Sequence, residues 1–121
     1  MKSRDIGDYL EDILLAVREV VAFTQGMTFE KFYEDRKPIN AVIRSLEVMG
    51  EAAKKIPEDF RRRHPNIPRR RMAAMRDKVI HEYFGVDRKI LWQTAQHDIP
   101  PLENVMEKII AELYIIEQNH D

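Results

Sequence analysis

Arg76, His81 and Tyr83 are the residues best suited to chemistry, because they fall close together among apolar residues such as Met75, Val79 and Ile80. Histidine titrates near neutral pH and can accept or donate a proton. The planar guanidinium of arginine matches the charge on phosphate oxygens. If this stretch is helical at about 100° per residue, Arg76 falls at the edge of an apolar stripe made by Met72, Met75, Val79 and Tyr83.

A charge at the edge of a core face needs a partner or a route to solvent. Arg76 could extend outward through its aliphatic stem, or pair with a carboxylate from a neighbouring helix. Glu47 and Glu51 in the preceding long helix are the candidate partners. They could instead form simple pairs with Arg44 along their own helix.

His81 lies about 140° from Arg76 on the helical wheel, so one straight helix cannot bring both side chains to a single atom. Either the helix ends or bends near Ile80, or two copies of the chain compose the site. Taken alone, His81 could be an exposed residue paired with Asp77 at i, i+4, and Tyr83 could be a core tyrosine.

Two arginine triplets, Arg61 to Arg63 and Arg69 to Arg71, flank a proline-bounded turn ahead of this stretch. From Arg61 to Lys78, seven arginines and one lysine stand against one aspartate, a charge of +7 in a chain of net charge −1. Such a run is usually a solvated surface. Beside Arg76 and His81 it indicates an approach for phosphate, and candidate RNA-binding residues are Arg61, Arg62, Arg63, Arg69, Arg70, Arg71 and Lys78.

The pattern Arg-x-x-x-x-His-x-Tyr at a helix end resembles the signature of the HEPN superfamily, and Arg76 to Asp87 is similar to its HepT toxin branch. The resemblance extends upstream through Arg44 to Pro57. Downstream it includes Leu91-Trp92 and Asp98 to Pro100, so it covers roughly the last two thirds of the chain.

This resemblance implies a ribonuclease toxin of a HepT/MntA-type toxin–antitoxin system, with Arg76 and His81 catalytic in a cleft shared by two chains. RNA, with tRNA as one candidate, would be the substrate. Tyr83 would accept adenylyl groups from a minimal nucleotidyltransferase antitoxin. Relatives often have asparagine at the position of Asp77, and a carboxylate there could tune His81 or weaken phosphate binding.

Apolar residues recur at helical spacing along the whole chain, which predicts one all-α domain over residues 1–121, an up-and-down bundle of four to five main helices. The first helix runs from Ile6 to near Gly26, and Thr28 caps a short second one. The third extends from Pro38 to Pro57. A short helix precedes the arginine-rich turn, and the helix that follows it runs from Arg69 to Tyr83. Asp87 caps another helix, and a long helix follows Pro100-Pro101, either as a kinked continuation or as a separate element.

Other chemistries find little support in the residues. The chain has no cysteine, no His-Glu-x-x-His and no glycine-rich phosphate loop, so we expect no metal and no cofactor. We expect a cytoplasmic protein without a signal peptide or membrane span. The residues fit metal-independent RNA cleavage, in which the substrate's own 2′-hydroxyl attacks the adjacent phosphate. The alternative is a non-catalytic helical module that binds a nucleotide or a partner protein.

Overall fold

The fold, obtained as a computed structural model, is described over residues 5–81 and 87–118, and in these ranges it contains helices and no strand. The all-α prediction is therefore confirmed. In chain order the elements are α1 (Ile6–Thr24), α2 (Phe29–Glu34), α3 (Arg36–Lys54), α4 (Glu58–Arg63), α5 (Arg69–His81), α6 (Arg88–Gln93), the π-helical turn η1 (Thr94–Asp98) and α7 (Pro100–Gln118).

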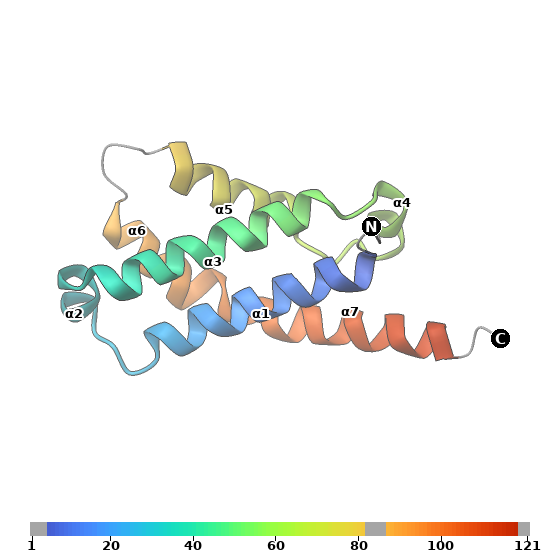
Figure 1. Cartoon of the computed structure of the whole chain (residues 1–121), viewed down its shortest axis with the longest axis horizontal. Helices are drawn as coiled ribbons and strands as arrows, with labels where there is room; N and C mark the ends of the chain where they lie inside the picture. Colours follow the sequence, from blue (N-terminus) through green and yellow to red (C-terminus); the bar gives the residue numbers. More distant parts are fainter. Residues whose placement is uncertain (1–4, 82–86, 119–121) are drawn as a thin grey trace.

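The four long helices α1, α3, α5 and α7 form the bundle, and neighbouring ones run in opposite directions (Figure 1). α1 packs against α3 on one side and α7 on the other, and α3 packs against α5. In Figure 1, α2 and α6 lie together at one end of the bundle and α4 lies at the other. This is the up-and-down arrangement that the helical spacing predicts.

Short polar side chains begin the helices, as the sequence indicates. Asp5 and Asp8 form a reciprocal capping box at the start of α1. Thr28 caps α2 and Asp87 caps α6 by accepting hydrogen bonds from first-turn backbone N–H groups. These acceptors satisfy donors that the helix itself leaves unpaired.

The segment from α6 to α7 is a kinked run of helix with one π-helical turn. Within η1 the backbone N–H of Ile99 donates to the carbonyl of Thr94 at 3.0 Å. Pro100 and Pro101 follow, and because neither has an N–H, the regular i to i−4 ladder cannot continue through them. The wider turn accommodates this interruption. The sequence alone had left open whether the segment forms one kinked helix or two.

The core runs along the facing sides of α1, α3 and α7, with α5 contributing Met72. Its largest fully buried side chains are Phe32, Leu10, Ile13, Leu46, Met49, Met72, Ile99, Met106, Ile109, Val17, Val20 and Val42. Not every apolar residue of the closing helix belongs to the core, since Ile116 is 58% exposed. Ile116 belongs to the last turn of α7, and Figure 1 shows this end of α7 extending past the start of α1. None of the described helices is long and apolar enough to cross a membrane.

Candidate functional site

Arg76 lies where α5 crosses α3 at Gly50. A Cβ atom added to Gly50 would fall 2.2 Å from Cβ and 2.6 Å from Cγ of Arg76, so only glycine permits this approach. The Arg76 side chain is 24% exposed. Its aliphatic stem therefore packs against the α3 backbone, while the guanidinium reaches the edge of the helix pair.

Two carboxylates hold this guanidinium. Its Nη2 atom lies 2.8 Å from Oε1 of Glu51 on α3, and its Nη1 atom donates to Oδ1 of Asp77 at 3.0 Å. Lys54 donates to the same Asp77 oxygen at 3.3 Å. Hydrogen bonds from Arg76, and then from Lys54, hold the pKa of the Asp77 carboxyl below its ordinary value. Arg76 is thus oriented by ion pairs, and an incoming anion must compete with them.

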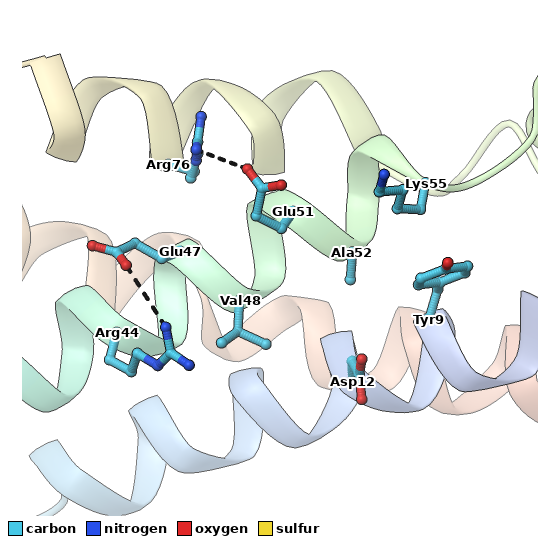
Figure 2. Close-up of a pocket in the computed structure, with 9 residues that line it drawn as sticks. All are labelled: Tyr9, Asp12, Arg44, Glu47, Val48, Glu51, Ala52, Lys55 and Arg76. Carbon is cyan, nitrogen blue, oxygen red and sulfur yellow. Dashed lines mark ion pairs between the residues drawn. The ribbon is translucent and has the colours of Figure 1, made fainter. Parts of the chain in front are cut away.

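The pair between Arg76 and Glu51 borders an open pocket of about 470 Å³ between α1, α3 and α5. Figure 2 shows Arg76 and Glu51 on one side of this pocket and Tyr9 and Asp12 of α1 on the other. The lining consists of an aromatic ring, two small apolar residues, three cationic groups and three carboxylates: Tyr9, Val48, Ala52, Arg44, Lys55, Arg76, Asp12, Glu47 and Glu51.

Glu47 and Glu51, which the sequence left as equal candidates, have different partners. Glu47 lies 4.0 Å from Arg44 on the same helix, while Glu51 pairs with Arg76 (Figure 2). The Arg44 side chain is 76% exposed, so this longer pair is worth little. Glu51 is therefore the carboxylate available to orient Arg76.

The remaining motif residues are only partly described. α5 stays helical through His81, its last residue, so the wheel angle between Arg76 and His81 applies along this helix. The side chains of Lys78 and His81 lie outside the described residues, as does all of Tyr83. Their predicted roles stay predictions.

The first arginine triplet lies on α4, and two of its members pair within that helix. Arg62 donates to Glu58 at 3.1 Å, and Arg63 lies 3.8 Å from Asp59. These are exposed i, i+4 pairs, which contribute little to stability. Each pair nevertheless places a negative charge beside one arginine of the triplet.

The second triplet forms the first turn of α5, and its first member has a structural contact. Arg69 donates from Nε to the carbonyl of Ala53 at 2.9 Å and from Nη2 to that of Lys54 at 3.3 Å. Both carbonyls lie at the end of α3, where helical carbonyls lack intrahelical partners. Arg69 thus ties the start of α5 to the end of α3. Arg70 and Arg71 remain exposed on other sides of α5.

Several residues of this site were not anticipated from the sequence. Lys54 supports Asp77, Lys55 and Tyr9 line the pocket, and Gly50 sets the distance between helices. Gly50 carried a readable signal, because a glycine inside a helical pattern costs stability unless a close contact requires it. Tyr9 carried none, since its approach to α3 depends on tertiary packing.

Comparison with known proteins identifies the group to which the chain is related. The family model described as Ribonuclease HepT-like matches residues 13–109, which include α3, α5, Arg76 and His81. The chain belongs to this family. The resemblance inferred from the sequence motif is thereby confirmed. No cluster of three or more possible metal-ligating side chains occurs among the described residues of this HepT-like chain.

Individual members of the HepT-like family align over nearly the whole chain. The protein named "Probable ribonuclease HepT" from Thermococcus cleftensis is 55% identical over 88% of this chain and 97% of its own length. "Putative RNase MJ0125" of Methanocaldococcus jannaschii is 48% identical over 93% of this chain and 97% of its own. "Putative RNase MJ1216" of the same organism is 46% identical, over 93% of each chain. No solved structure matches the chain significantly.

Proposed function

We propose that this chain is an endoribonuclease that cleaves RNA without a metal ion and acts as the toxin of a HepT/MntA-type toxin–antitoxin pair in the cytoplasm. The observation that carries the proposal is the setting of Arg76. Its guanidinium is oriented by Glu51 and Asp77 at the border of an open pocket, within the segment shared with ribonucleases HepT.

In the proposed reaction, the 2′-hydroxyl of the substrate attacks the adjacent phosphorus atom and loses its proton, and the 5′-oxygen of the next nucleotide leaves. The products are a 2′,3′-cyclic phosphate and a free 5′-hydroxyl. His81 moves the proton, and Arg76 stabilises the added charge on the phosphate oxygens. The excess of arginine before the motif attracts the RNA backbone.

We further propose that Arg76 and His81 meet across a two-fold dimer. The backbone of α5 is helical through His81, and positions 76 and 81 lie about 140° apart around its axis, which favours a site composed from two chains. Ala74 on α5 is small and exposed, so another helix could approach closely there. Each site would then combine Arg76 of one chain with His81 of the other.

Cleavage of a defined RNA in the presence of a chelator tests the activity. We expect His81→Ala and Arg76→Ala to reduce the rate by about 100-fold or more, in the range of general acid–base catalysis. The exposed His97 offers a matched control, and His97→Ala should cleave normally. Binding of RNA without cleavage by the wild-type chain would instead support a non-catalytic binding module.

Mixing the two inactive variants tests the shared site. A heterodimer of Arg76→Ala and His81→Ala retains one intact combination if each site draws on both chains, so activity should reappear on mixing. If each site belongs to a single chain, the mixture stays inactive. Light scattering that shows a monomer at micromolar concentration would also contradict the dimer.

A further inference from the structure

A second pocket lies at the end of the bundle where the turn after α4 leads into α5. Its volume is about 680 Å³, larger than the pocket beside Arg76. Four arginines contribute to its lining: Arg61, Arg69, Arg70 and Arg71. Among the described residues, no acidic side chain lines it. A concave site of this composition is suited to an anion rather than to an apolar ligand.

The contacts divide the two arginine triplets into compensated and available charges. Arg62 and Arg63 are paired with carboxylates of their own helix, and neither lines the pocket. Arg70 and Arg71 line the pocket and form no ion pair with the described residues. The arginines of the first triplet are thus partly neutralised by carboxylates, whereas Arg70 and Arg71 remain available to an anion.

Arg61 supplies a further indication of an anion. Its Nε atom is buried and has no hydrogen-bond partner within the described part of the chain, although the residue borders the pocket. A buried donor without an acceptor is energetically unfavourable, because it has lost its hydrogen bonds to water. A phosphate oxygen in the pocket would provide the missing acceptor.

The first turn of α5 also favours negative charge. The backbone N–H of Met72 is bonded to the carbonyl of Pro68, so the helical ladder begins there and the N–H groups of Arg70 and Arg71 precede it. Unpaired N–H groups and the positive end of the helix dipole attract phosphate. Arg69, fixed to the end of α3, keeps this turn in position.

We propose that this arginine pocket is a second phosphate-binding subsite, which holds backbone phosphates of the RNA beyond the nucleotides at Arg76. The inference rests on the proposed ribonuclease function. Arg70 and Arg71 precede Arg76 by five to six residues, about 8–9 Å along the helix axis. Both are exposed, and on the helical wheel they lie about 120–140° from Arg76, which contacts α3. The strand would therefore pass around the amino-terminal half of α5. The subsite contributes affinity and register, not chemistry.

Two double variants test this subsite, and each removes two positive charges. Arg70→Ala with Arg71→Ala removes two pocket arginines, and Arg62→Ala with Arg63→Ala removes two compensated ones. All four side chains are exposed, so both variants should fold. Binding of labelled single-stranded RNA is measured against salt in a His81→Ala background, so that the RNA stays intact. Cleavage is measured in the active background.

The pocket variant should lower the slope of log K against log salt by about 1.4, or about 0.7 for each lost phosphate contact. Its KM should rise while kcat stays within about twofold, the result expected when uniform binding is lost. The control pair should change the slope by less than half as much. The subsite proposal would be overturned if both double variants lowered the salt slope equally, or if the pocket variant lowered kcat at constant KM.

The same measurements separate this inference from the proposed function. If the wild-type chain binds RNA but does not cleave it, the ribonuclease proposal fails while the slopes still decide the subsite. If cleavage is normal and both pairs leave the slope unchanged, the subsite is wrong and the ribonuclease proposal stands.

Discussion

Gly50 of α3 contacts the stem of Arg76 of α5 so closely that a single added methyl group would lie within 2.6 Å of two of its carbon atoms. The contact joins the proposed catalytic arginine to the backbone of the central helix. It also brings Glu51, the next residue, to 2.8 Å from the guanidinium. The position of Arg76 therefore depends on the absence of a side chain at position 50.

Gly50→Ala should move α5 away from α3 and displace Arg76. Alanine is the better helix former by about 1 kcal/mol, but overpacking a tight contact typically costs about 1–3 kcal/mol, so we expect net destabilisation. Urea unfolding measures this change, and cleavage should fall with it. Gly7→Ala is the control, because among the described residues a Cβ there would meet the Asp5 side chain at 3.2 Å and Leu113 at 3.8 Å and nothing closer. A Gly50→Ala protein as stable as wild type would contradict the close contact.

Glu51→Gln should lower kcat about tenfold, because a displacement of 1 Å at a reacting group can cost up to about 100-fold. KM should not rise, since one competitor for the guanidinium is also gone. Glu47→Gln is the matched control on the same helix, and it should change neither constant because Glu47 pairs with Arg44. Equal effects of the two substitutions would show that Glu51 does not orient Arg76.

Asp77→Asn should make the free energy of unfolding less dependent on pH in the acidic range. Hydrogen bonds from Arg76 and Lys54 lower the pKa of Asp77 in the folded chain, so its ionised form favours folding. This contribution is present above the unfolded pKa of about 4 and is lost as pH falls through the lower folded value. Wild type should exceed the variant in unfolding free energy near pH 7, and the difference should vanish in acid. A difference that grows below pH 4 would have the wrong sign.

Tyr83→Phe tests the proposed control by an antitoxin. An adenylyl group on Tyr83 would add bulk and negative charge in the cleft that RNA phosphate must enter. Incubation with the cognate nucleotidyltransferase and ATP should add mass to the wild-type chain and silence it, while Tyr83→Phe should gain no mass and stay active. Intact-mass spectrometry gives the answer. Mass that persists in the variant would assign the modification to another residue.

The sequence alone determined most elements of this fold, although it left open whether the segment from α6 to α7 is one kinked helix or two. Apolar spacing fixed the long helices, and Thr28 and Asp87 marked helix starts because side-chain caps act within one turn. Such signals are local, so they can be read along the chain without knowledge of its folding. The Arg76 motif was likewise readable, because residue type and short spacing define it, and the family that it indicated is the one whose model matches the chain.

Only the tertiary structure decided which charges meet. Arg62, Arg69 and Arg70 look alike in the sequence, yet one pairs within its helix, one binds the end of α3 and one lines a pocket. Glu47 and Glu51 differ in the same way. The contacts of Arg69 and Glu51 depend on the crossing of α3 and α5, where Gly50 permits the close approach. Such long-range packing leaves no periodic trace in the sequence.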